Sequence, residues 1–326
     1  NIGEISEEDL DEYSKHWEYL EEKYHKGFDR FLSFVRTILL KNKPSSNLLD
    51  EYEKNIYQKN ILKKGKNTID FLIELDGIYD KIIDLNDENL SNEYKNLVTI
   101  MKLGLHSDEW IPTVLSYFLK FEYYNLDEFI KKLEYKFIGD LMSNVSPSKR
   151  RENLNNIIKT IEIVSKENID ILFENRELFD IDKNIFRKNI NGDIYGKKYT
   201  KYLLLKMEYL MNDNSVYLSN YKEISIEHVL PQNPLKKSHW RRDFTEEQRK
   251  LWTNKLSNLV LISNKKNVKL ANLDFKKKKE EYLKNRMDVF NSSKIFLDKS
   301  SKWDETNLRN RQNIMVNMLI NNKYSE

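Results

Sequence analysis

One short stretch, ISIEHVLP at residues 224–231, gives the clearest indication of the fold that we expect for the C-terminal part of the chain. Within it, Ile224, Ile226 and His228 occupy every second position. An alternation of this period is typical of a β-strand, whose successive side chains point to opposite faces. Pro231 lacks a backbone N–H and is expected to end the strand. The stretch therefore places a histidine near the end of a short strand.

A second apolar segment, LVLI at residues 259–262, predicts the partner strand. A polar loop over residues 263–266 is expected to lead into Asn267, at the entry to a helix. The expected order is strand, long connection, strand, helix. A helix packed across such a hairpin would bring His228, Asn258 and Asn267 together around one pocket.

Most of the remaining chain reads as helix, because apolar residues recur at a spacing of three or four. The expected helices cover residues 28–39, 69–83, 111–119, 126–138, 154–161 and 202–211. We interpret each apolar stripe as core packing in a helical bundle. The sequence thus predicts a mainly α protein, with a helical domain over residues 1–195 and a second domain over residues 196–326.

The composition excludes several classes of protein. The chain has 326 residues and no cysteine, so a disulfide scaffold, a thiolate zinc site and a Cys nucleophile are ruled out. Its 8 Gly and 5 Pro argue against a glycine-rich nucleotide-binding fold or a loop-rich β-sandwich. We find neither a signal peptide nor an apolar run of the roughly 20 residues that a membrane span needs. We therefore expect a cytoplasmic protein with no membrane partner.

Charge is distributed unevenly along the chain. The formal net charge is only +3, yet residues 1–100 carry −7 and residues 201–326 carry +10. A basic segment of this kind suggests a surface that binds a polyanion. The last third of the chain is therefore the expected place of contact with nucleic acid.

The pattern around the two strands resembles a known nuclease motif. IEHVLP at 226–231, LSNLVLI at 256–262 and NKKN at 264–267 resemble the HNH, or His-Me finger, motif. The resemblance is closest to the nuclease module of GmrSD-like type IV restriction endonucleases. Further positions agree with that family: Leu203 to Leu205 with Glu208, Phe275 with Lys278, and Trp303 and Leu308 with Arg311. The N-terminal ParB-like domain of such proteins has no counterpart here, so we expect the chain to be a C-terminal piece.

The resemblance implies a ββα-metal unit and a role for each motif residue. His228 would be the general base that activates water, and its near-neutral intrinsic pKa suits that task. Asn258 would fix the loop or the imidazole beside it. Glu227 and Asn267 would bind the metal through oxygen atoms, which suits Mg²⁺ or Mn²⁺. In a regular strand Glu227 points away from the His228 face, so a salt bridge is an alternative for this carboxylate.

Basic side chains near the motif are candidates for contact with DNA. Lys236, Lys237, Arg241 and Arg242 lie in the connection after the first strand, and the resemblance adds Lys278. Such contacts would give salt-dependent affinity without sequence preference. The alternative for any one of these residues is a plain solvated surface charge.

These features together predict a metal-dependent DNA endonuclease. The resemblance further implies the nuclease part of a restriction or anti-phage defence protein that acts on modified or foreign DNA. Its expected partners are DNA and an N-terminal domain that senses DNA and hydrolyses nucleotides. Two alternatives stay open: a helical DNA-binding or partner-docking module whose nuclease has decayed, and an RNA-directed nuclease toxin. The sequence leaves the oligomeric state open.

Overall fold

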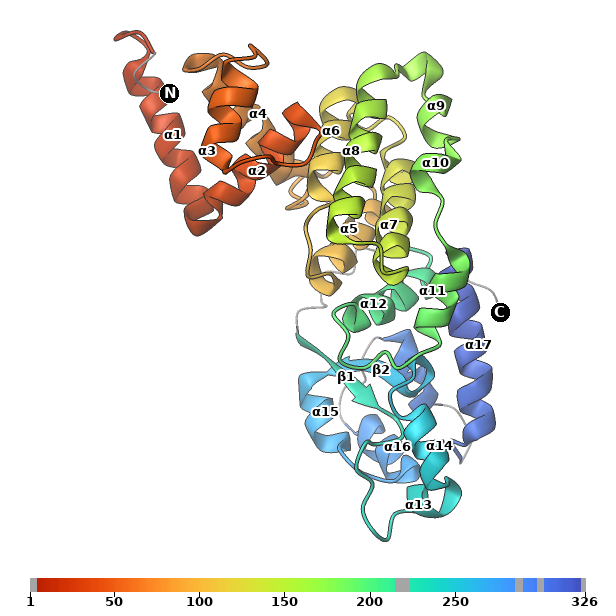
Figure 1. Ribbon diagram of the computed structural model, residues 1–326. Coiled ribbons are helices and arrows are strands. Elements are labelled where there is room, and N and C mark those ends of the chain that lie inside the picture. Colours follow the sequence, from red (N-terminus) through yellow and green to blue (C-terminus); the bar gives the residue numbers. More distant parts are fainter. Residues whose placement is uncertain (1–4, 215–222, 285–289, 298–301, 324–326) are drawn as a thin grey trace. The chain divides into compact units, whose positions relative to one another are not determined.

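The chain is mainly helical and divides into two compact units. The computed structural model describes residues 5–214, 223–284, 290–297 and 302–323 (Figure 1). One unit consists of Asn1–Ser91 and Ser107–Asp180, and the other of Asn92–His106 and Ile181–Glu326. Within the described residues there is a single sheet, and it has two strands. The prediction of a mainly α chain is confirmed, and the domain boundary at residue 195 stays a prediction.

The first unit is built from helices alone in its described part (Figure 1). Its helices are α1 (Leu10–Tyr24), α2 (Phe28–Leu40), α3 (Leu48–Asp50), α4 (Lys66–Ile82), α6 (Ile111–Phe121), α7 (Leu126–Met142), α8 (Pro147–Ile163), α9 (Asp170–Phe173) and α10 (Arg176–Phe179), with a π-helix at Glu51–Tyr57. Five of them coincide with apolar stripes that predict helix, namely α2, α4, α6, α7 and α8. Helix α6 packs against both α7 and α8.

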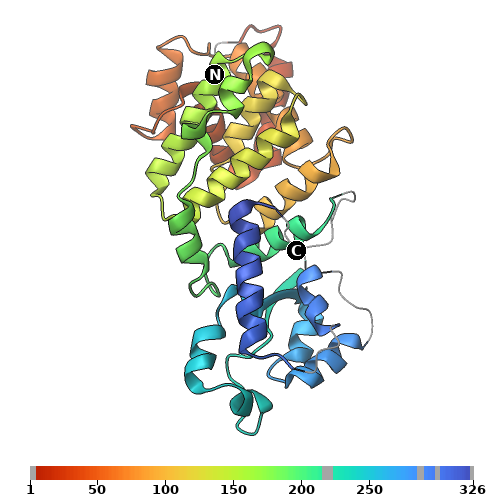
Figure 2. The same cartoon turned by 90° about the vertical axis from the view of Figure 1, so that its right-hand side faces the viewer.

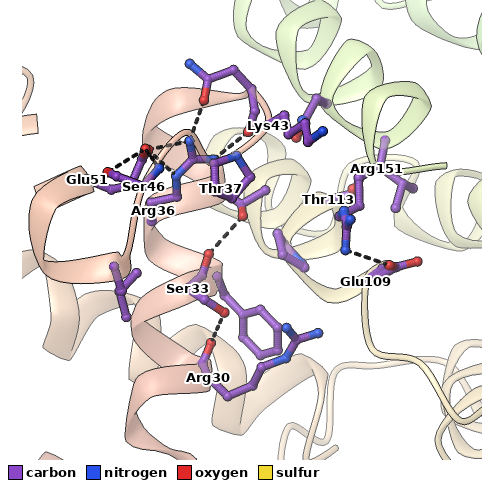
Figure 3. A pocket seen from close by; sticks show the side chains of 17 residues that line it. Arg30, Ser33, Arg36, Thr37, Lys43, Ser46, Glu51, Glu109, Thr113 and Arg151 are labelled. Atoms are coloured by element: carbon purple, nitrogen blue, oxygen red, sulfur yellow. Dashed lines mark hydrogen bonds and ion pairs between the residues drawn. The ribbon is translucent and has the colours of Figure 1, made fainter. Parts of the chain in front are cut away.

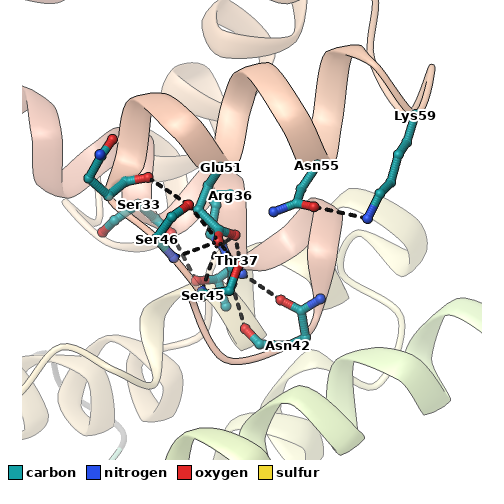
Figure 4. A network of polar contacts seen from close by, with 10 residues as sticks. Ser33, Arg36, Thr37, Asn42, Ser45, Ser46, Glu51, Asn55 and Lys59 are labelled. Atoms are coloured by element: carbon teal, nitrogen blue, oxygen red, sulfur yellow. Dashed lines mark hydrogen bonds and ion pairs between the residues drawn. The ribbon is translucent and has the colours of Figure 1, made fainter.

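A buried polar network fixes the segment between α2 and the π-helix (Figure 4). One carboxylate oxygen of Glu51 accepts hydrogen bonds from Arg36 Nε at 3.0 Å and Arg36 Nη2 at 2.6 Å. The other accepts from the backbone N–H of Ser45 at 2.8 Å and of Ser46 at 3.1 Å, and from the hydroxyls of both serines. Arg36 and Glu51 are 2% and 1% exposed, so this ion pair is removed from water.

We expect Glu51→Gln to lower the free energy of unfolding by about 3 kcal/mol at pH 7, because it leaves the Arg36 charge buried without its partner. Burial alone would raise the pKa of Glu51, but hydrogen bonds from Ser45 and Arg36 outweigh it and lower the pKa from 4.5 to about 2. The carboxylate therefore stabilises the fold above pH 4.5, and this stability is lost as the pH falls towards 2. Urea unfolding of the wild type and of Glu51→Gln checks this. The difference between their free energies of unfolding should be smaller at pH 3 than at pH 7.

An exposed ion pair provides the control for that measurement. Glu152 lies 2.9 Å from Lys149 with its side chain 58% exposed. Glu152→Gln should change the free energy of unfolding by less than about 0.5 kcal/mol. An equal effect of the two substitutions would contradict the role given to the buried network.

The second unit combines helices with the two-stranded sheet (Figure 2). Its elements are α5 (Asn92–Gly104), α11 (Lys183–Ile190), α12 (Thr200–Met211), β1 (Ile224–His228), α13 (His239–Asp243), α14 (Glu246–Trp252), β2 (Leu259–Ser263), α15 (Asn264–Leu270), α16 (Phe275–Leu283) and α17 (Glu305–Asn321), with a 3₁₀ segment at Asn291–Phe296. Both strands lie where the alternation and the apolar run predict them.

The sheet has two differently used faces. Strands β1 and β2 are antiparallel, with Glu227 opposite Val260 and His228 opposite Leu259. Val260 belongs to the aromatic-rich core that also includes Leu270 of α15 and Phe275 of α16. Because directly paired residues share a face, Glu227 points to the side of α15 and α16, and His228 points to the other side.

The structure corrects one prediction about this unit. Residues 263–266 were expected to form a polar loop with the helix starting at Asn267, but α15 begins at Asn264 directly after β2. The Asn264 side chain accepts a 2.6 Å hydrogen bond from Ser225 Oγ of β1, which ties the start of the helix to the sheet. The helix ends at Leu270, and the next residue, Ala271, has a φ of 33° that separates α15 from α16. Asn267 therefore lies in the middle of α15.

Candidate active site

His228 is the last residue of β1 and is almost completely buried. Its side chain is 8% exposed, and its Nε2 is a buried atom with no hydrogen-bond partner. The Tyr195 ring meets the imidazole edge-on, with ring centroids 4.2 Å apart. The backbone N–H groups of Ile194 and Tyr195 donate to the Asn254 carbonyl at 2.8 and 3.2 Å, which holds Tyr195 in place. The imidazole nitrogen Nε2 thus has no protein partner and is closed to solvent in this structure.

Burial lowers the pKa of His228 from 6.5 to about 4. A hydrogen bond with Asn254 raises this pKa in part, and the positive charge of Lys278 lowers it further. The imidazole is therefore neutral at pH 7, and stability linked to it is lost only as the pH falls from 6.5 towards 4.

We expect Tyr195→Ala to expose the ring of His228 and move its pKa upwards, towards 6.5. Tyr195→Phe keeps the ring contact and should leave the pKa unchanged, and NMR titration of His228 measures both. Equal pKa values in the wild type and in Tyr195→Ala would show that Tyr195 does not shield the imidazole.

Asn258 joins the two loops beside the strands. It ends the 3₁₀ turn Leu256–Asn258 before β2 and is completely buried. Its Oδ1 accepts from the Leu230 N–H at 2.8 Å, and its Nδ2 donates to the Leu230 and Thr253 carbonyls, each at 2.8 Å. Its amide is thus engaged by backbone groups. This geometry supports a positioning role in the loop after His228 and leaves no atom to contact substrate.

Glu227 and Lys278 form a buried ion pair on the opposite face of β1. The Lys278 ammonium group donates to Glu227 Oε1 and, at 2.6 Å, to the His228 carbonyl. Glu227 is 6% exposed, and burial raises its pKa, while Lys278 is 0% exposed, and burial lowers its pKa. Each charge opposes the shift of the other. The salt bridge considered as an alternative for Glu227 is present.

The position of Lys278 corrects the prediction that it contacts DNA. Its side chain is fully buried, so it does not reach the surface where a duplex would lie. The sequence itself indicates that Lys278 is buried, although the resemblance suggested contact with phosphate. Phe275, Lys278 and Tyr282 are spaced by three and four residues and are all buried, so they share the inner face of α16.

Asn267 lies on the same side of the sheet as Glu227. It is one turn beyond Asn264, which binds Ser225, and residues three apart share a helix face. Ser225 and Glu227 are two apart on β1 and share a strand face. Asn267 is partly exposed, and no hydrogen bond joins its side chain to the described residues. This spacing puts Asn267 on the Glu227 side of the sheet, whereas the His228 side chain lies on the other side. The structure therefore does not bring His228 and Asn267 together around one pocket, contrary to the expectation from the sequence.

The oxygen donors near β1 fit a hard divalent ion with a small protein ligand set. Glu227 has a second carboxylate oxygen beside the one that binds Lys278, and the Asn267 amide is unengaged. Mg²⁺ commonly takes one or two protein oxygens and completes its shell with water and substrate phosphate. Within the described part of the chain there is no cluster of three His, Cys, Asp or Glu residues, so a full protein cage is not formed there.

The loop and helix after β1 present the predicted cationic surface. Lys236 and Lys237 are exposed and make no ion pair within the described residues. Arg241 donates through Nε to the Pro234 carbonyl at 3.0 Å, which braces the loop. Arg242 is 2.9 Å from Asp243, and its side chain is 69% exposed. Of these four cations, Lys236 and Lys237 are therefore the two whose charge is least neutralised by neighbouring groups.

Two charged residues named by the resemblance hold the backbone around the strands. Arg311 Nη1 donates to the Ser257 carbonyl at 3.0 Å, next to Asn258, and its guanidinium lies 5.8 Å from the centre of the Trp303 ring. The Glu208 carboxylate accepts from the Asn291 and Ser292 N–H groups at 2.6 and 2.8 Å. Both residues support the site without lining it. Tyr195 and Asn254, which lie beside His228, had no local signal in the sequence.

The comparisons with known proteins agree with this geometry. Residues 179–318 match the model of the family described as GmrSD restriction endonucleases, C-terminal domain. No curated protein matches the chain. Among the described residues no helix is long and apolar enough to cross a membrane. The matched segment holds β1, β2, α15, α16 and every residue of the candidate site, so residues 179–318 of this chain are similar to the C-terminal domain of GmrSD restriction endonucleases.

Proposed function

We propose that the second unit hydrolyses phosphodiester bonds of DNA as an HNH-type, metal-dependent endonuclease. The observation that carries the proposal is the unpartnered Nε2 of His228, next along β1 to an acidic residue, within a restriction endonuclease domain. A neutral imidazole with an open lone pair is the group that a general base requires. Its pKa of about 4 in the free protein would rise when a phosphate anion lies beside it.

In the proposed reaction His228 takes a proton from a water molecule as the water oxygen attacks phosphorus. The bond from phosphorus to the 3′ oxygen breaks, the 3′ oxygen leaves and takes up a proton, and the products carry 5′-phosphate and 3′-hydroxyl ends. Asn258 keeps the loop after His228 in register through its bonds to Leu230 and Thr253. Glu227 and Asn267 would be the residues that hold a Mg²⁺ or Mn²⁺ ion, which supplies Lewis-acid chemistry for phosphodiester hydrolysis. Both lie on the side of the sheet opposite the His228 imidazole, so this role requires β1 and the loop after it to rearrange when the ion and DNA bind.

DNA affinity is assigned to the surface next to this site. Lys236 and Lys237, with support from Arg241 and Arg242, would contact the phosphate backbone without reading sequence. Such a surface suits a nuclease that acts on foreign or modified DNA in a restriction system, with recognition of the modification left to another domain.

The direct test is incubation of the purified chain with supercoiled plasmid, with Mg²⁺, with Mn²⁺ and with EDTA. We expect nicked or linear plasmid in the presence of either metal and none in EDTA. Structured RNA serves as the parallel substrate. Cleavage of RNA with no cleavage of plasmid would overturn the assignment of DNA as the substrate, and cleavage of neither would overturn the nuclease assignment.

A further inference from the structure

The first unit contains a pocket that the proposed nuclease reaction does not use. Its volume is about 420 Å³, and α2, α6 and α8 line it together with the segment after α2 (Figure 3). In Figure 3 the α2 side chains Ser33, Arg36 and Thr37 lie across the pocket from Thr113 and Arg151. A volume of this size accommodates a small organic ligand.

Positive charge in the lining is only partly neutralised. Arg36 is matched by Glu51 within the buried network. Lys43 is exposed and has no ion pair within the described residues. Arg151 has its nearest carboxylate at 3.5 Å on Glu109, whose other oxygen lies 3.1 Å from Arg150. Lys43 and Arg151 are thus two cations that can hold an anion at the pocket.

Two polar groups in the lining lack a protein partner. Asn155 of α8 is only 5% exposed and its side-chain amide makes no hydrogen bond with the described residues. Thr113 Oγ1 of α6 is buried and also without a partner. Buried polar atoms are nearly always hydrogen-bonded, so the unpartnered Thr113 Oγ1 is unusual. The Asn155 amide lines the cavity and is free to hydrogen-bond a ligand there. Phe34 and Pro112 add apolar surface beside it.

We propose that this pocket binds a small organic phosphate. Lys43 and Arg151 hold the phosphate group by charge-assisted hydrogen bonds, and Asn155 hydrogen-bonds a polar group of the organic part. The apolar side chains of Phe34 and Pro112 pack against the remainder. A nucleotide unit has this chemistry, either as a free nucleotide or within a DNA strand, and both sources are compared in the test.

The test is calorimetric titration of the full chain with adenosine 5′-monophosphate, with inorganic phosphate, and with a short single-stranded oligonucleotide. We expect binding of the monophosphate, and weaker binding of inorganic phosphate because it lacks the contact with Asn155. The surface around Lys236 and Lys237 is also proposed to bind DNA, so oligonucleotide binding supports this pocket only to the extent that Lys43→Ala or Arg151→Ala weakens it. Lys43→Ala and Arg151→Ala should each weaken binding about tenfold. Asn155→Asp, which preserves the size of the side chain and adds a negative charge, should abolish it.

Two controls separate this site from folding and from the nuclease. Lys159→Ala removes an exposed cation of the same helix, α8, outside the pocket lining, and should bind as the wild type does. His228→Ala should also bind normally, so a failed nuclease assay leaves this proposal untouched. Thermal unfolding checks that each variant is folded. The proposal is overturned if no probe binds at millimolar concentration, or if folded Lys43→Ala, Arg151→Ala and Asn155→Asp all bind as the wild type does.

Discussion

Replacement of His228 by Ala is expected to lower the rate of plasmid nicking by about 10²- to 10⁴-fold, the usual contribution of a general base. The variant loses the imidazole whose Nε2 is buried and without a hydrogen-bond partner among the described residues. The fold should survive, because the imidazole itself makes a ring contact with Tyr195 and carries none of the backbone bonds of the strand. Initial rates at saturating Mg²⁺ measure the effect.

His106→Ala is the matched control, because His106 is an exposed histidine of the same unit whose Nδ1 lies 2.9 Å from the Lys198 carbonyl. It should nick plasmid as fast as the wild type. The pH dependence adds a second readout: with the pKa of free His228 near 4, the acid limb of kcat/KM should lie well below pH 6.5. Undiminished nicking by folded His228→Ala would remove His228 from the mechanism.

Helices with a continuous apolar stripe were predictable from the sequence, because their burial pattern is local. Helix α6 is an example: its apolar stripe predicts the helix, although eight consecutive residues from Ile111 to Phe118 are buried, so the burial goes all the way round. Helix α5 was not predicted. It belongs to the second unit, where its last residue, Gly104, lies so close to α12 that a Cβ would be 2.5 Å from the Tyr202 Cα. Such a contact joins residues about 100 apart, and no local pattern encodes it.

The candidate site was predictable to the extent that it follows the strand and helix motif. His228, Asn258 and the two strands lie where the motif places them. The partners of these residues were not predictable, because they depend on tertiary packing. Lys278 is one of four consecutive lysines, and composition alone does not say which of them is buried. Tyr195 lies 33 positions before His228 and meets it only in the folded unit.

The Lys278→Met substitution is expected to lower the free energy of unfolding by about 3–5 kcal/mol, because it leaves the Glu227 carboxylate buried without its partner. Lys278 is fully buried and joins Glu227 of β1 to α16 while also donating to the His228 carbonyl. Lys277→Met, at the neighbouring exposed position, should cost less than about 0.5 kcal/mol. Urea unfolding of both variants at pH 7 gives the comparison.

The double variant Glu227→Gln with Lys278→Met separates the ion pair from simple loss of packing. If the cost of Lys278→Met comes from an unpaired charge, neutralising Glu227 should restore most of the lost stability. Equal instability of the single and double variants would instead assign the cost to the cavity left by the lysine stem.

The same pair decides whether Glu227 is a metal ligand, because the ammonium group and a divalent ion compete for one carboxylate. In wild-type protein Mn²⁺ must share Glu227 with Lys278, so calorimetry should show weak binding that Glu227→Gln and Asn267→Ala both reduce. Lys278→Met removes the competing ammonium group. The folded fraction of this variant should therefore bind Mn²⁺ more tightly than the wild type does. If the wild type, Glu227→Gln and Asn267→Ala all bind Mn²⁺ with the same affinity, Glu227 is not a metal ligand. Its role is then limited to the salt bridge with Lys278.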